Sequence, residues 1–95
     1  MGFPLASHVS VSEDILVKEL EGEAVLLNLK TESYFGLDEV GTRMWNVLTS
    51  SNSIQDAHKI LLQEYEVDQE VLIHDIENFV KRLIKEEMIK LAENE

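Results

Sequence analysis

The spacing of apolar and polar residues changes near residue 38. Before that point, short apolar runs alternate with turn-forming residues, a pattern typical of β-strands. The runs predict strands over residues 15–20, 23–29 and 33–37, joined by short turns into an antiparallel meander. The middle run is almost continuously apolar, so we expect it to be covered on both faces. The run over residues 33–37 then lies at an edge of the sheet.

After residue 38 the apolar residues recur with the period of an α-helix. The pattern predicts three helices, over residues 38–50, from Ser53 to about 65, and over 69–87. Asp38, Ser53 and Asp68 stand at the three starts, where a side-chain oxygen can accept from the open N–H groups of the first turn.

Two further segments, residues 8–12 and 88–91, are weaker strand candidates. Residues 1–7 are expected to form a flexible tail with little to bury. The 95 residues suffice for one domain with a modest core. A three-stranded antiparallel sheet followed by three helices is an α+β layout, similar to a winged helix-turn-helix.

Two features of this layout predict a peptide-binding groove. The edge run from Tyr34 to Leu37 carries no lysine or proline, the residues that commonly protect an exposed strand edge. The last helix has an apolar arc of about 140°, wider than one packed face needs. Its members are Leu72, Ile76, Phe79, Val80, Leu83 and Ile84, flanked by Ile73. If this helix lies beside the edge strand, an extended peptide could add to the sheet between them.

The charge balance narrows the class of partner. Nineteen acidic residues stand against eight basic ones, for a formal net charge of −11. Nucleic acids and anionic membranes need the opposite excess, so a protein or peptide partner is favoured over both. The chain has no cysteine, which excludes disulfides and thiolate metal sites. Its first residues lack the pattern of a signal peptide, and we expect a cytoplasmic location.

Candidate chemistry is sparse. His8, His58 and His74 have no histidine partner at metal-binding spacing, so we expect solvated side chains and neither a metal nor a cofactor. No nucleophile–base pair can be argued from spacing, and we expect no catalytic residue. Asp75 has two interpretations: a partly exposed charge paired with Arg82 or with a strand residue, or an acceptor at the lip of a groove. The lone Trp45 is interpreted as a core residue.

The chain resembles the PqqD-like family of precursor-peptide recognition elements, and most closely the stand-alone leader-binding proteins of lasso-peptide biosynthesis. The resemblance covers roughly residues 16–91. It rests on Val25-Leu26-Leu27-Asn28-Leu29, on Tyr34-Phe35-Gly36-Leu37-Asp38-Glu39-Val40-Gly41 followed by Trp45, and on Asp75-Ile76, Phe79-Val80 and Leu83.

The resemblance implies a non-catalytic protein that binds the leader segment of a ribosomally made precursor. It also implies delivery of that leader to a cysteine protease of transglutaminase-like fold, with an ATP-dependent cyclase as a possible further partner. In such proteins the leader adds as a strand beside the third strand and the third helix. Carried onto this chain, the expected peptide-binding residues are Leu27, Leu29, Tyr34, Phe35, Gly36, Leu37, Leu72, Asp75, Ile76 and Phe79.

Two alternatives stay open at this point. The layout also suits a winged-helix DNA-binding regulator, although residues 69–87 are poor in basic residues for a major groove. The second alternative is a structural subunit of a partner enzyme, with no peptide groove. The helical pattern also leaves open which edge of the last helix would face a peptide. We favour the edge with Leu72, Asp75 and Phe79 over the edge with Ile73, Val80 and Ile84.

Overall fold

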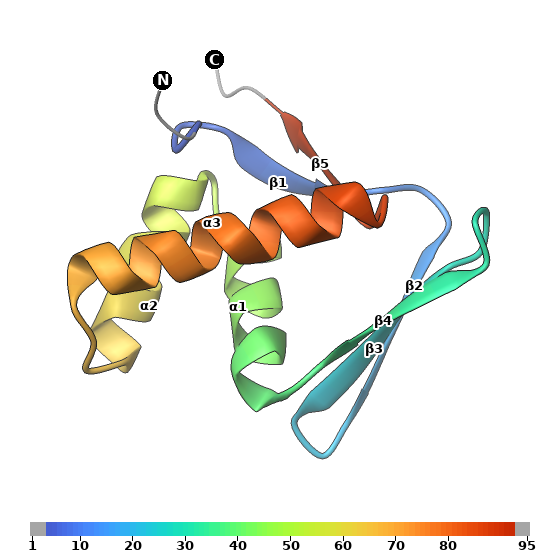
Figure 1. Cartoon of the computed structure of the whole chain (residues 1–95), viewed down its shortest axis with the longest axis horizontal. Coiled ribbons are helices and arrows are strands. Elements are labelled where there is room, and N and C mark those ends of the chain that lie inside the picture. The colour runs from blue at the N-terminus through green and yellow to red at the C-terminus, as the bar shows by residue number, and fades with distance from the viewer. Residues whose placement is uncertain (1–3, 93–95) are drawn as a thin grey trace.

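The computed structural model describes residues 4–92. The elements follow one another as β1 (His8–Val11), β2 (Ile15–Leu20), β3 (Glu23–Asn28), β4 (Ser33–Leu37), α1 (Glu39–Ser50), α2 (Ile54–Glu64), α3 (Gln69–Lys85) and β5 (Ile89–Ala92) (Figure 1). The α+β class and the winged-helix-like layout predicted from the sequence are confirmed. The last helix ends at Lys85, two residues earlier than expected, and Glu87 then takes a left-handed φ of 59°.

The main sheet is the predicted meander, with strand order β2-β3-β4 and both pairs antiparallel. Glu21 and Gly22 connect β2 to β3 with φ values of 55° and 84°. Two consecutive positive φ angles are what a tight hairpin turn requires. The register places Val17, Leu26 and Phe35 side by side on one face, and Leu16, Leu27 and Tyr34 on the other.

The two weaker strand candidates are strands, and they pair with each other. β1 and β5 form a separate antiparallel ribbon in which Val9 lies opposite Leu91. Because β5 is bonded to β1, no strand within residues 4–92 pairs with the outer edge of β4. The edge position predicted for this strand is confirmed.

The hydrophobic core lies between the helices and one face of the sheet. Among residues 4–92, eighteen buried apolar residues form a single cluster that includes Leu26, Leu48, Leu61, Ile76 and Leu83. Trp45 is only 3% exposed, so its interpretation as a core residue is confirmed. The predicted caps are also present: the carboxylate of Asp38 accepts from the N–H of Gly41 at 2.7 Å, and the Ser53 hydroxyl accepts from the N–H of Asp56 at 3.0 Å.

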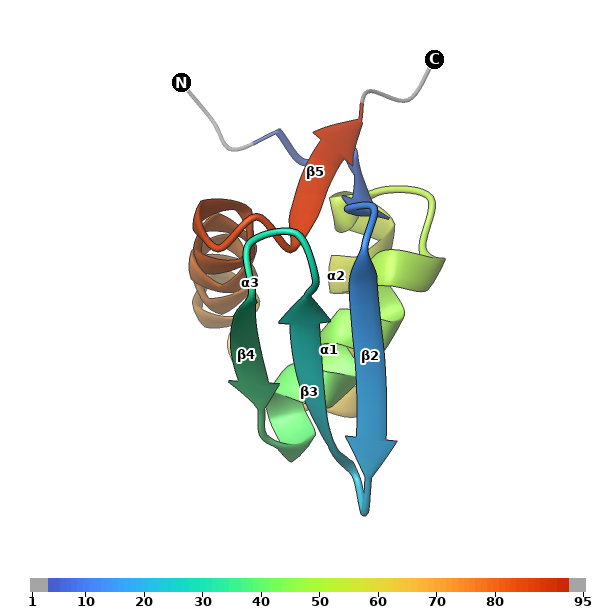
Figure 2. The ribbon, with the colours of Figure 1, turned by 90° about the vertical axis from the view of Figure 1, so that its right-hand side faces the viewer.

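The prediction that residues 23–29 are covered on both faces is wrong. The helices lie behind the sheet and beside β4, and the opposite face is open (Figure 2). On that face Leu16 is 54% exposed, Val25 47% and Tyr34 75%. The apolar run could not reveal this, because a strand covered on both faces and a strand with an uncovered apolar face have the same composition.

Residues 4–7 also differ from the expected tail. The carbonyls of Leu5 and Ser7 accept from the first N–H groups of α2, Gln55 at 2.9 Å and Ile54 at 2.8 Å. Ser7 is buried as a result. The open N–H groups at a helix start attract any nearby acceptor, and the sequence pattern does not show that the chain passes there. Residues 1–3 of the expected tail lie outside the described residues.

Candidate functional site

A groove runs between the free edge of β4 and one face of α3. One part is a hollow of about 550 Å³. Its walls are β4 and the start of α1 on one side and α3 on the other. The residues on the sheet side are Phe35, Gly36, Leu37, Asp38, Val40, Gly41 and Met44, and those on α3 are Asp75, Asn78, Phe79 and Arg82.

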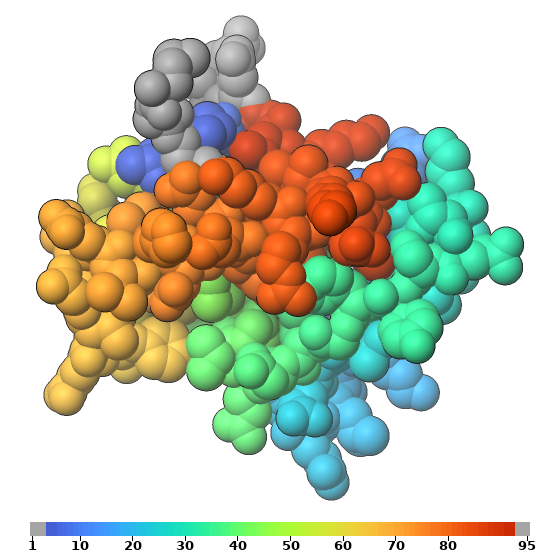
Figure 3. All heavy atoms as spheres, in the orientation of Figure 1, coloured from blue at the N-terminus to red at the C-terminus, as the bar shows by residue number. Residues whose placement is uncertain are grey.

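A second hollow of about 420 Å³ continues the first toward the start of β4. It is lined by Tyr34, Phe35, Gly36, Arg82, Lys85 and Glu86. Phe35, Gly36 and Arg82 belong to both hollows, so we treat the two as one groove. The end of β4 faces the middle of α3 and the start of β4 faces its last turn, so the two elements run in opposite directions. In Figure 3 the atoms of α3 (orange) meet those of β4 and α1 (green) along this side of the molecule.

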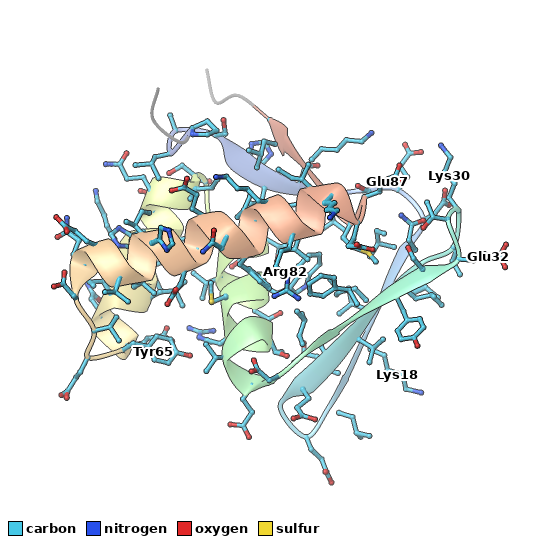
Figure 4. The ribbon with its side chains drawn as sticks, viewed as in Figure 1. Lys18, Lys30, Glu32, Tyr65, Arg82 and Glu87 are labelled. Atoms are coloured by element: carbon cyan, nitrogen blue, oxygen red, sulfur yellow. The ribbon has the colours of Figure 1, made fainter. Side chains whose placement is uncertain are left out.

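Arg82 lies where the two hollows join. Its guanidinium carbon is 4.9 Å from the ring centroid of Phe35, within range of a cation–π contact. Figure 4 shows the side chain extending from α3 toward the sheet. The contact joins the two walls of the groove and places a positive charge at its centre. No ion pair between Arg82 and Asp75 is formed within the described chain. Asp75 lines the larger hollow, and its role as an acceptor for a peptide stays a prediction.

Asn28 holds the sheet against the end of α3. Its amide nitrogen donates to the carbonyl of Glu87 at 2.9 Å, across 59 positions of sequence. Its amide oxygen accepts from the backbone N–H groups of Lys30 at 2.9 Å and Thr31 at 3.1 Å. Asn28 is 3% exposed, and these partners engage its donor and its acceptor. Because β4 follows this turn directly, the contact also sets how close β4 lies to α3.

The structure brings together six of the ten residues expected to bind a peptide. Phe35, Gly36, Leu37, Asp75 and Phe79 line the larger hollow, and Tyr34 lines the smaller one. The other four do not line the groove. Leu72 and Ile76 are buried in the core, Leu27 lies on the open face of β3, and Leu29 follows the end of that strand.

The structure also places the two edges of α3. Asp75 and Phe79 face β4, whereas Val80 is fully buried and Ile84 lines a different hollow. Sequence reasoning did not assign Asn78, Arg82 or Lys85 to the site, although all three line the groove. They follow Asp75 by three, seven and ten positions, and this spacing is a usable signal because it keeps residues on one helix face. It becomes informative only once the face turned toward β4 is known.

A third hollow, of about 490 Å³, lies beside the C-terminal end of α3, between the β3–β4 turn and the β1–β5 ribbon. Asn28 and Glu87, which line it, already bond to each other. Turn residues line it together with Ile89, Lys90 and Leu91 of β5, and none of its lining residues belongs to β4.

The histidines lie apart from the groove. His74 is exposed, and His58 Nε2 lies 3.3 Å from the carbonyl oxygen of Gln69. His8 differs from the expected solvated state, because its Nδ1 is buried without a hydrogen-bond partner within residues 4–92. In the same described range, no group of three or more histidine, aspartate or glutamate side chains is arranged to hold a metal ion. No helix there is long and apolar enough to cross a membrane.

The fold and the groove define a winged-helix-like domain with an open strand edge facing a helix. The profile of the PqqD family, described as coenzyme PQQ synthesis protein D, matches residues 23–89. That span is most of the chain, and the protein therefore belongs to the PqqD family.

Two solved structures have the same fold. The structure of TbiB1 in complex with the TbiA(beta) leader peptide matches with a TM-score of 0.80 and 31% identity, over 85% of this chain and 94% of that one. A lasso peptide synthetase B1 complexed with the leader peptide matches with a TM-score of 0.79 and 24% identity, over 87% and 98%. No curated protein shows significant similarity to the chain.

Proposed function

We propose that this protein binds the leader segment of a ribosomally made precursor peptide, in lasso-peptide biosynthesis, by strand addition to β4. The observation that carries the proposal is the free edge of β4 facing a wall of α3 side chains. Membership of the PqqD family supports it, and so does a relative with 31% identity that was solved with a leader peptide bound.

The groove has the parts that strand addition uses. The unpaired backbone of β4 supplies hydrogen bonds that do not depend on the peptide's sequence. Phe35, which is half-buried, offers apolar surface to a side chain of the peptide, and Phe79 adds the 8% of its surface that is exposed. About four hydrogen bonds at about 1 kcal/mol each, and two or three anchors at about 1.5–3 kcal/mol each, exceed the several kcal/mol lost on ordering the peptide. The upper part of the range that remains corresponds to micromolar binding or tighter.

The protein acts in this proposal as a non-catalytic carrier that delivers the leader to a leader-removing protease of transglutaminase-like fold. A carrier needs a second surface that stays free when the groove is filled. The open face of the sheet meets that need, because Leu16, Val25 and Tyr34 form an exposed apolar surface that adjoins the groove at β4. Apolar surface of this kind marks sites of protein association. The proposal includes the cyclase of lasso-peptide biosynthesis as a further partner.

Isothermal titration with the leader peptide encoded beside this gene tests the binding. The wild type should bind at micromolar concentration or below. Phe35→Asp should abolish binding, because it places a charge on the groove wall beside β4. Leu16→Asp is the matched control, since it places the same charge on the open face at the far strand, and it should bind normally. Circular dichroism and Trp45 fluorescence report whether each variant is folded.

The outcomes separate the parts of the proposal. No binding by the folded wild type would refute leader recognition by this protein. Binding that survives Phe35→Asp would refute the groove as its place. For delivery, Val25→Lys should leave leader binding intact but lower the rate of leader removal by the protease. An unchanged rate would show that the open face is not the surface used.

A further inference from the structure

We propose that the groove selects peptides by charge, taking an acidic side chain at one end and a basic side chain at the other. The inference rests on the proposed function and specifies the peptide that the groove accepts. It follows from the order of the charged residues that line the groove on α3 and at the start of α1, which changes sign at Arg82.

The basic end is the smaller hollow, where Arg82 and Lys85 project from the last turns of α3. Glu86 lines the same hollow and offsets part of this charge, but it is half-buried whereas Arg82 and Lys85 are exposed. Neither basic side chain forms an ion pair with any described residue, unlike the neighbouring Lys81, which bonds Glu77 at 3.1 Å. On a chain with a net charge of −11, two such cations mark a local site for a carboxylate.

The acidic end is the part of the larger hollow beside the end of β4. Asp75 from α3 and Asp38 from the start of α1 both line it. Asp38 uses one carboxylate oxygen to cap α1, while Asp75 is exposed and makes no ion pair within residues 4–92. A lysine or arginine of the peptide would meet two carboxylates here.

The distance between the two ends sets the spacing of charges in the peptide. Along α3, Asp75 and Arg82 are about 10 Å apart and Asp75 and Lys85 about 15 Å, at about 1.5 Å per residue. A β-strand advances about 3.3 Å per residue. The acidic and basic residues of the peptide therefore lie about three to five positions apart.

The order of the two charges also reports the direction of the bound strand. β4 runs from the basic end of the groove to the acidic end. A peptide antiparallel to β4 runs the other way, so its basic residue precedes its acidic one. A parallel peptide has the opposite order.

The test is a selection from a random library of displayed peptides of about 12 residues, long enough to span the groove. The full chain is the target, and binders that the uncharged variant Phe35→Ala fails to retain are kept. We expect these binders to share an acidic and a basic residue at the stated spacing. In about 50 mM salt, where screening is weak, Lys85→Glu should weaken a selected peptide about tenfold. Changing the acidic residue of that peptide to lysine should restore most of the loss.

The controls keep charge separate from folding and from net charge. Lys85→Glu removes no hydrogen bond or ion pair formed within the described residues, and so should leave the fold intact. Lys59→Glu makes the same change in charge on α2, away from the groove, and should alter affinity less than about twofold because salt screens distant charges. Charge selection would be overturned if the groove binders lack paired charges. It would also be overturned if the peptide with lysine in place of its acidic residue does not restore the affinity lost in Lys85→Glu. Either result would leave leader binding standing. An absence of groove binders would overturn both.

Discussion

Replacing Asn28 with alanine tests whether one buried amide holds the sheet against α3. The change removes the bond from the amide nitrogen to the carbonyl of Glu87 and both bonds accepted by the amide oxygen. Each such bond contributes about 1 kcal/mol net. The two turn N–H groups can regain water because Lys30 and Thr31 are exposed, so we expect a loss of about 2–3 kcal/mol in the free energy of unfolding.

The assay is urea unfolding followed by the fluorescence of Trp45, which is buried beneath the sheet and reports loss of the core. For a domain of this size the expected loss corresponds to a fall in Tm of about 10–20 °C. Thr31→Ala is the matched control. It removes only the exposed contact between the hydroxyls of Thr31 and Ser33 and should change stability by less than about 0.5 kcal/mol.

A second variant separates the donor from the acceptor. Asn28→Asp keeps an oxygen toward the turn but places a negative charge against the carbonyl of Glu87. Near neutral pH it should be at least as destabilised as the alanine variant, because a buried charge then faces an acceptor. Part of the loss, measured against wild type at the same pH, should disappear below about pH 4, where a protonated carboxyl can donate. A loss under about 1 kcal/mol for Asn28→Ala would refute the account.

Three further results follow from the structure. Leu83→Ala should lower the free energy of unfolding by about 2–5 kcal/mol, because the side chain is fully buried; a smaller loss in urea unfolding would mean that the core closes around the cavity. Gly22→Ala should lower the free energy of unfolding by about 1 kcal/mol because φ is 84° there. Gly36→Ala should leave it nearly unchanged, because an added Cβ meets nothing within 4 Å. Equal melting temperatures for the two variants would contradict this expectation. The Arg43 guanidinium donates to the Glu64 carboxylate at 2.7 Å and lowers the pKa of that carboxyl below its usual 4.5. The pair therefore adds a little stability above that pH and loses it as the carboxyl is protonated, so Glu64→Gln should reduce the fall in Tm between about pH 5 and pH 3. An unchanged fall in Tm would show that the pair does not contribute to acid destabilisation.

The sequence by itself determined the local structure of this protein. Tight-turn residues such as Glu21-Gly22 and capping residues such as Asp38 mark where strands and helices begin and end, because they act on neighbouring backbone groups. The edge position of residues 33–37 followed as well, since short turns leave little choice of strand order. The family resemblance, carried by a continuous motif around Tyr34 and Trp45, could also be read without a structure.

Only the tertiary structure decided which surfaces are covered and which charges meet. The packing of the helices decides that one face of β3 is open. The apolar composition of β3 is compatible with one covered face or with two. Arg82 stacks on Phe35 and does not pair with Asp75 because of the way α3 is rotated against β4. The bond from Asn28 to Glu87 joins residues 59 positions apart. These contacts arise between elements distant in sequence, so no local pattern of residues encodes them.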